Sequence, residues 1–186
     1  QPLEDGQVTI SRAAGTMTFP SQFMLVAAMN PTPDGKMPAE SRSSPREIQN
    51  YLGRISGPLL DRIDLHVEVP PVKFREMSAQ AGGESSATIR ERVIASRSIQ
   101  SKRFDGKIAC NARMQSRDLQ RHCALNDSTR DLLKMAMEEL DLSARAYDRI
   151  LKVARTIADL AGAESLGVEH VSEAIQYRSL DRQIWT

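Results

Sequence analysis

The chain has 186 residues, of which 40% are hydrophobic and 26% are charged, with nine prolines and ten glycines. This balance is typical of globular proteins and excludes collagen-like, low-complexity and intrinsically disordered classes. Lysine and arginine total 25 against 24 for aspartate and glutamate, so net charge alone indicates neither a nucleic-acid-binding nor a membrane-surface protein. The longest apolar run, from Phe23 to Met29, is too short to span a bilayer, and we expect no membrane partner.

The cysteines and histidines indicate no metal site. Cys110 and Cys123 are the two cysteines, which excludes a disulfide framework and a four-cysteine zinc site. His66, His122 and His170 lie far apart without metal-ligand spacing, so we predict that no metal is bound. The amino end has no basic segment leading into an apolar stretch, so no signal peptide is expected and the predicted location is cytoplasmic.

The first third of the chain has the pattern of strands and turns. Gln7–Ser11 and Thr16–Phe19 alternate apolar and polar residues around a turn containing Gly15, which predicts a β-hairpin. The continuous apolar run Phe23–Met29 predicts a strand buried on both faces of a parallel sheet. This predicted strand ends at Asn30-Pro31, a turn signal.

A loop, a short helix and a second strand are predicted next. The segment 32–44 is polar and contains prolines and a glycine, which predicts a loop. Pro45 can occupy the first position of a helix that has Ser44 as its N-cap. Further on, Asp64–Val69 alternates apolar and polar residues and ends at two prolines, which predicts a strand near the edge of a sheet.

The segment 79–85 is rich in small residues and predicts a linker between a partial α/β unit at 1–78 and a helical domain at 86–186. Every periodic segment after it is helical. The expected helices are 86 to about 104, 116–122, 127–140, 143–161, and a last one marked by Val168, Val171 and Ile175. The predicted fold class is therefore an α/β remnant followed by an all-α bundle, mostly helical overall.

Candidate functional residues stand at the junctions between these elements. Asn30 directly follows the predicted buried strand, which would place its amide at the carboxyl edge of a sheet, where ligands bind in open α/β folds. Arg62 precedes the second predicted strand. Arg145 falls in the first turn of the helix predicted at 143–161, where the helix dipole disfavours a cation, and Arg149 lies one turn later on the same face. Each arginine taken alone is better explained as a solvated or locally paired surface residue, because most exposed charges have no measurable effect.

The chain shows no independent catalytic constellation. It contains no Gly-x-Ser-x-Gly elbow, no His-Glu-x-x-His pair and no glycine-rich phosphate loop. Basic residues crowd the helix predicted at 86–104, which suits a nucleic-acid surface, although a solvated face explains them as well. These residues are Arg90, Arg92, Arg97, Lys102 and Arg103.

Four sequence blocks carry a resemblance to a known family. In chain order they read QPLEDGQVTISRA (1–13), LVAAMNP (25–31), YLGRISGPLLDRID (51–64) and LSARAYDRILKVARTIADL (142–160). Together these blocks resemble the magnesium-chelatase-like AAA+ ATPases of the ComM/YifB type. The resemblance implies the carboxyl-terminal part of an AAA+ P-loop core with an inserted β-hairpin, followed by a helical lid.

The resemblance also implies a role for each candidate residue. Asn30 matches the sensor asparagine that orients the attacking water beside the γ-phosphate, and Arg62 matches the arginine finger offered to a neighbouring subunit's nucleotide. Arg145 matches the second sensor on the helical lid, with Arg149 as a further nucleotide contact. Arg12, near the tip of the hairpin, is the candidate contact for a nucleic-acid backbone.

The implied parent protein is a ring-forming ATPase, with a hexamer expected, that uses ATP and Mg²⁺ and acts on DNA. Family members carry the phosphate-loop lysine and the acidic magnesium-binding strand ahead of the first block, and this sequence shows neither. We therefore expect a carboxyl-terminal fragment that binds no cofactor and does not hydrolyse ATP on its own. Many relatives also have a cysteine-rich stretch after the Asn-Pro pair, but segment 32–37 has no cysteine and so no metal-binding role.

Two other functions stay open. The parent could be a chelatase-type ATPase subunit that remodels a protein partner for metal insertion into a porphyrin, as the wider family name implies. Alternatively, the chain could be a non-enzymatic helical interaction module attached to a degenerate core. A phosphate loop upstream of Gln1 would favour an ATPase, and its absence would favour the interaction module.

Overall fold

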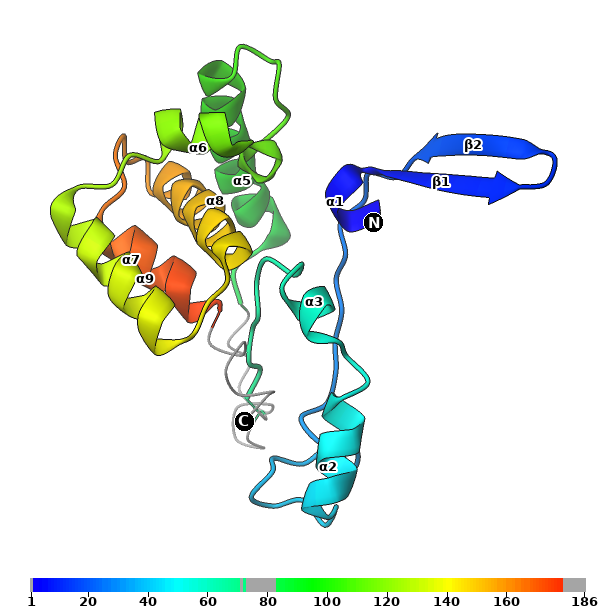
Figure 1. The fold of residues 1–186 in the computed structure, drawn as a ribbon. Coiled ribbons are helices and arrows are strands. Elements are labelled where there is room, and N and C mark those ends of the chain that lie inside the picture. The colour runs from blue at the N-terminus through cyan, green and yellow to red at the C-terminus, as the bar shows by residue number, and fades with distance from the viewer. Residues whose placement is uncertain (1, 71, 73–82, 179–186) are drawn as a thin grey trace. The chain divides into compact units, whose positions relative to one another are not determined.

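The computed structural model describes the whole chain except residues 1, 71, 73–82 and 179–186 (Figure 1). The chain divides into two compact units, Gln1–Arg62 and Ile63–Thr186. The described residues form eight α-helices, one 3₁₀-helix and one two-stranded antiparallel sheet, which confirms the mostly helical fold class. Most of the linker predicted at 79–85 lies outside the described residues, so that domain division stays a prediction.

The first unit opens on a short helix and a β-hairpin. Helix α1 (Pro2–Asp5) leads into strand β1 (Gln7–Arg12), which pairs with β2 (Gly15–Pro20). The hairpin was predicted from its alternating sequence, and the structure confirms it; α1 was not predicted. Gly15 closes the turn with a φ of 142°, a conformation that glycine adopts without strain.

The two faces of this hairpin differ in chemistry, because successive side chains of a strand point to opposite sides. One face carries paired hydroxyl groups, with oxygen–oxygen distances of 2.9 Å between Thr9 and Thr18 and 3.0 Å between Ser11 and Thr16. The other face is apolar and ends in Arg12 at the turn. Its apolar residues are Val8, Ile10, Met17 and Phe19.

Two predicted strands are wrong. The run Phe23–Met29 is not a strand, and its side chains are exposed instead of buried, reaching 86% for Met24 and 80% for Val26. The segment Asp64–Val69 is not a strand either. A strand requires a neighbour that accepts and donates its backbone hydrogen bonds, and among the described residues the sheet consists of β1 and β2 alone.

Two helices complete the first unit, α2 (Pro45–Leu52) and α3 (Gly57–Leu60). The predicted cap of α2 is confirmed as a capping box. The Glu47 amide donates to Ser44 Oγ at 3.3 Å, and the Ser44 amide donates to the Glu47 carboxylate at 2.8 Å. Hydrogen bonds from the Ser44 amide and hydroxyl lower the pKa of Glu47, so the capping box persists when the pH falls moderately.

The second unit is a helical bundle built around α8 (Ala144–Leu160), which lies between the other helices in Figure 1. Helix α8 contacts α5, α6, α9 and the 3₁₀-helix η1, and α9 also contacts α7. The bounds of these elements are Ser86–Arg103 for α5, Asn111–Arg113 for η1, Ser116–His122 for α6, Asp127–Glu139 for α7 and Val168–Gln176 for α9. All five predicted helices are confirmed, and η1 was not predicted.

The core of this unit follows the apolar stripe of α8. Ala146, Ile150, Ala154 and Ala158 are fully buried, each 0% exposed. Side chains from the neighbouring elements pack against this stripe, and these are Phe104, Met114, Leu119, Cys123, Leu133, Leu166, Val171 and Ala174. Helix α8 begins at its predicted cap, where the Ala146 amide donates to the hydroxyl of Ser143 at 3.2 Å.

Candidate functional site

Arg62 ends the first unit, two residues after α3. Its Nη1 donates to the Pro58 carbonyl at 2.6 Å, and its Nη2 lies 3.1 Å from Oε2 of Glu4 on α1. The side chain is 24% exposed, and its Nε is buried with no hydrogen-bond partner among the described residues. The guanidinium is thus held by two groups of its own unit, and its Nε donor is unused.

A hollow of about 500 Å³ surrounds this arginine. Its lining combines the start of α1 with the turn that leads into α3. The lining residues are Pro2, Leu3, Phe23, Ser56, Pro58, Leu59 and Arg62. Apart from Arg62 and Ser56 the lining residues are apolar.

Asn30 lies at the start of an ordered turn. Its predicted place at the edge of a sheet is wrong, because the segment directly before it, Phe23–Met29, is not a strand. The hydroxyl of Tyr51 on α2 donates to the Asn30 carbonyl at 3.1 Å. The Asn30 amide lies beside Gly35, where an added Cβ would be 3.5 Å from Nδ2. Gly35 has a φ of +77°, so glycine both fits this turn and leaves room for the amide.

The turn after Asn30 is organised by Asp34. The hydroxyls of Thr32 and Ser41 donate to its Oδ1 at 2.7 and 2.8 Å, and the amide of Arg42 donates to its Oδ2 at 2.9 Å. These bonds, led by the one from the Arg42 amide, hold the pKa of Asp34 well below its usual value. The segment predicted as a loop is therefore ordered, and the signal for it was an aspartate followed by glycine.

Arg145 and Arg149 lie one turn apart on α8 in the second unit, as their spacing predicted. Arg145 is exposed in the first turn of the helix. Arg149 is 18% exposed and forms an ion pair with Asp64, which precedes it by 85 residues. The candidate residues are therefore divided, with Asn30 and Arg62 in the first unit and the two α8 arginines in the second.

The remaining basic candidates are divided between exposed and engaged residues. Arg12 is exposed beside the hairpin turn, opposite Gly15. On α5, Arg92 pairs with Glu84 at 2.6 Å and Arg103 is drawn into the interior of the second unit. Arg90, Arg92, Arg97 and Lys102 of the α5 group are all exposed.

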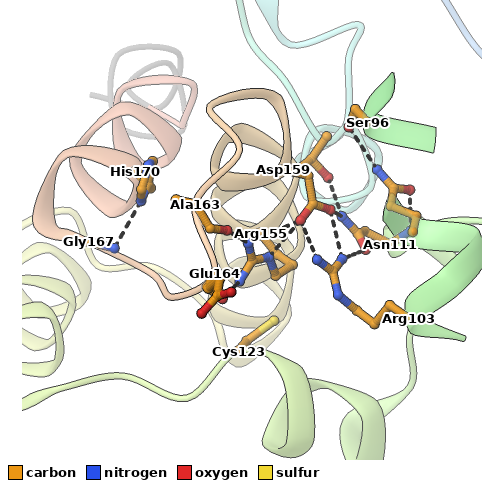
Figure 2. Close-up of polar contacts among 12 residues, drawn as sticks. Ser96, Arg103, Asn111, Cys123, Arg155, Asp159, Ala163, Glu164, Gly167 and His170 are labelled. Atoms are coloured by element: carbon orange, nitrogen blue, oxygen red, sulfur yellow. Dashed lines mark hydrogen bonds and ion pairs between the residues drawn. The ribbon is translucent and has the colours of Figure 1, made fainter. Parts of the chain in front are cut away.

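A buried polar network in the second unit was missed by the sequence analysis (Figure 2). At its centre is Asp159, whose side chain is 0% exposed. Its carboxylate accepts hydrogen bonds from Arg103 at 2.7 Å, from Arg155 at 3.1 Å and from Asn111 at 2.8 Å. Burial raises the pKa of Asp159, but the hydrogen bonds from Arg103 and Asn111 and the nearby positive charges outweigh it, so the pKa is lowered.

This network joins the ends of several elements. Arg155 also donates to the carbonyls of Ala163 at 2.6 Å and Glu164 at 2.8 Å, just beyond α8. The backbone amide of Asn111 donates to the side-chain Oε1 of Gln100 on α5 at 3.1 Å. One signal was present in the sequence, because Arg155 lies four residues after Leu151 and therefore on the buried stripe of α8. Since its polar groups serve one another, we assign the network a structural role.

The thiols are structural as well. Cys123 is buried, and burial raises its pKa to about 11, while Cys110 is partly exposed; both are free. Among the residues that the structure describes, no group of three or more His, Cys, Asp and Glu side chains could hold a metal ion. None of the described helices is long and apolar enough to cross a membrane.

Comparison with known proteins gives two family matches and several relatives. The family "Magnesium chelatase, subunit ChlI" matches residues 1–77, and "Magnesium chelatase, subunit ChlI C-terminal" matches residues 83–178, more than half of the chain. "Competence protein ComM" of Haemophilus influenzae is 47% identical over 98% of this chain. Proteins named YifB are 42% identical in Salmonella typhimurium and 41% identical in Escherichia coli over the same share.

The chain spans 36% of the length of each of these three relatives. The two family matches follow one another along the chain, and the second begins at residue 83, within the predicted linker at 79–85. The longer match includes all five helices of the bundle around α8. The chain therefore belongs to the magnesium chelatase subunit ChlI family, as the four sequence blocks predicted.

Proposed function

We propose that this chain supplies sensor and arginine-finger residues to a ring-forming AAA+ ATPase, expected to be a hexamer, that couples ATP hydrolysis to remodelling of DNA. The observation that carries the proposal is the state of Arg62. Its guanidinium is held at two points beside a hollow and retains an unused, buried Nε donor. A planar, permanently charged group held in this way suits the negative charge that develops on a transferring phosphoryl group.

The other candidates offer further groups that suit the phosphates of a nucleotide. Asn30 offers a neutral amide, which can orient a water molecule without adding charge to an anionic site. Its carbonyl is tied to Tyr51 and its turn is ordered by Asp34, so the amide has a rigid support. On α8, Arg145 and Arg149 offer cations one helical turn apart. These residues fit the phosphates of ATP, which would supply the phosphoryl group when bound, whereas Mg²⁺ would be held elsewhere in the whole protein.

The ion pair between Arg149 and Asp64 refines this proposal. The Nη1 of Arg149 is engaged by the Asp64 carboxylate, so a phosphate would bind the remaining N–H groups of this guanidinium or replace Asp64. Arg145 stays the proposed second sensor, and Arg149 is a proposed nucleotide contact whose guanidinium is shared with Asp64.

The hairpin supports DNA as the substrate. Arg12 stands exposed beside its turn, at the end of the apolar face, and arginine is a common donor to nucleic-acid phosphates. Such contacts are electrostatic, so binding should weaken steeply as the salt concentration rises.

The finger role is tested by Arg62→Ala in the full-length protein. Turnover of ATP should fall by about 10³- to 10⁵-fold with nucleotide binding preserved, because a finger acts on the transition state. Arg46→Ala, which removes an exposed arginine of α2, is the matched control and should leave turnover unchanged. Weakened nucleotide binding with intact turnover would overturn the assignment. The chain on its own should show no ATP hydrolysis.

The DNA role is tested separately, by binding of a single-stranded oligonucleotide to the full-length protein at several salt concentrations. Arg12→Ala should weaken binding and reduce the salt dependence by about one released counterion. Affinity that is independent of salt and unchanged in the variant would contradict DNA as the substrate.

A chelatase-type function is the second candidate, and the printed names of both matched families favour it. In that case a protein partner carrying a porphyrin, and not DNA, would stimulate ATP turnover. Parallel assays with single-stranded DNA and with such a partner separate the two functions. A full-length protein that neither binds nor hydrolyses ATP would instead indicate the non-enzymatic helical interaction module.

A further inference from the structure

We propose that Glu4 is the positioning residue of Arg62, so that helix α1 presents the guanidinium in the orientation needed for its reaction. This inference rests on the finger role proposed above. The carboxylate of Glu4 is the charged partner of Arg62, with 3.1 Å between Oε2 and Nη2. The other partner is the carbonyl of Pro58, which belongs to α3, the short helix that ends two residues before Arg62.

The two partners together fix the plane of the guanidinium. Pro58 engages Nη1 from within the local turn, while Glu4 engages Nη2 from a segment 58 positions away in the sequence. One partner alone would leave the group free to rotate about a single hydrogen bond, whereas two at different nitrogens define its orientation. Without Glu4, the local carbonyl is the remaining restraint on this side chain.

Glu4 stands on a fixed support. The amide of Gly6 donates to the Pro2 carbonyl at 3.2 Å, which closes α1, and Gly6 has a φ of 62° that favours glycine. The amide of Ser21 donates to the Gly6 carbonyl at 2.8 Å, so the end of α1 is tied to the base of the hairpin from the far strand as well. Glu4 therefore belongs to a rigid corner and not to a loose chain end.

Because the Glu4–Arg62 ion pair is partly exposed, an effect of Glu4 on turnover can be distinguished from an effect on folding. The side chains of Glu4 and Arg62 are 32% and 24% exposed, and ion pairs with that access to water contribute little to stability. Replacing Glu4 should therefore leave the fold intact. Its effect on turnover can be large, because displacement of a catalytic group by about 1 Å can reduce a rate by about 10²-fold.

The test uses Glu4→Gln in the full-length protein, with steady-state ATP turnover and single-turnover measurements on labelled ATP. We expect kcat to fall by roughly tenfold to 10²-fold with the KM for ATP unchanged, because the residue acts on the transition state through Arg62. Asp5→Asn makes the same change of charge at the next position of α1 and is the matched control, expected to keep kcat. Glu4→Asp, which retains the carboxylate, should recover part of the lost rate.

The double variant Glu4→Gln/Arg62→Ala decides whether Glu4 acts through Arg62. Its kcat should equal that of Arg62→Ala alone, since a positioning residue has nothing left to position. A further drop by the same factor would show an independent structural effect and overturn the inference. Unchanged or increased kcat in Glu4→Gln, with Arg62→Ala still strongly impaired, would also overturn it while leaving the finger role intact. If Arg62→Ala is itself fully active, the finger role fails and the inference fails with it.

Discussion

Replacing Asp159 by asparagine removes the charge at the centre of the buried network and keeps the size of the side chain. The aspartate is 0% exposed, and its partners Arg155 and Arg103 are 3% and 14% exposed. With the carboxylate gone, two guanidinium groups remain buried without a counter-charge. Removing one partner of a buried ion pair costs about 3–5 kcal/mol, which is a large part of the roughly 5–15 kcal/mol by which a domain is stable.

The free energy of unfolding of the chain can be measured by urea titration followed by helical circular dichroism, since most of the helix lies in the second unit. With a slope of about 1–3 kcal/mol per molar urea, the expected loss moves the midpoint down by roughly 2 M at an unchanged slope. Asp127→Asn is the control. Its ion pair with Arg130 involves side chains that are 95% and 61% exposed, so the midpoint should hardly change.

A shift of the midpoint below roughly 0.5 M for Asp159→Asn would refute the reasoning, because it would correspond to less than about 1.5 kcal/mol even at the upper slope. The two guanidiniums would then have to reach water or other acceptors without cost. A changed slope would instead indicate an altered unfolded or native ensemble, and the free energy would have to be obtained from thermal unfolding.

Three further predictions concern the same unit. Because the folded pKa of Asp159 lies below its ordinary value of 3.8, its contribution to stability is present above about pH 4 and is lost as the pH falls through the folded pKa. Asp159→Asn should therefore flatten the acid limb of a stability–pH curve. Iodoacetamide at pH 8 should modify Cys110 well before Cys123, whose pKa is about 11, and equal rates by peptide mass spectrometry would contradict its burial. Gly162→Ala should cost about 1 kcal/mol in urea unfolding, since φ is +70° and nothing lies within 4 Å of the added Cβ; an unchanged midpoint would argue against the left-handed conformation.

The helices of the second unit could be predicted because each has its own stripe and cap. The stripe from Ala146 to Ala158 repeats at helical spacing, and Ser143 is a strong N-cap, so local sequence determines where α8 begins. The hairpin could be predicted for the same reason, because its two strands are adjacent in the sequence and pair with each other.

Strands that need a distant partner could not be predicted in this way. The composition of Phe23–Met29 is that of a buried strand, but composition does not supply the neighbour whose hydrogen bonds make a strand. The same holds for Asp64–Val69. In the described chain the first of these segments exposes its apolar side chains, which no pattern of residues within it could reveal.

For the candidate site, residues could be proposed from the sequence, but their contacts could not. The roles of Asn30, Arg62 and Arg145 came from the resemblance to a family, which identifies residues one by one. Their partners come from distant parts of the chain, as Glu4 does for Arg62 and Asp64 does for Arg149. Such pairs depend on how the elements pack, and nothing in the spacing of the residues reveals them.

The network around Asp159 has a consequence for how α5 stays in place. The buried residues of α5 are Ser96 and Gln100, and neither of them is apolar. Apolar packing alone would therefore not determine the position of α5 along α8. A displacement of one residue would separate Arg103 from Asp159 and leave the largely buried Arg103 guanidinium without its counter-charge, while Asp159 would keep Arg155, at a cost of several kcal/mol. The polar contacts therefore fix the register of α5 along α8, although α5 buries no apolar side chain of its own.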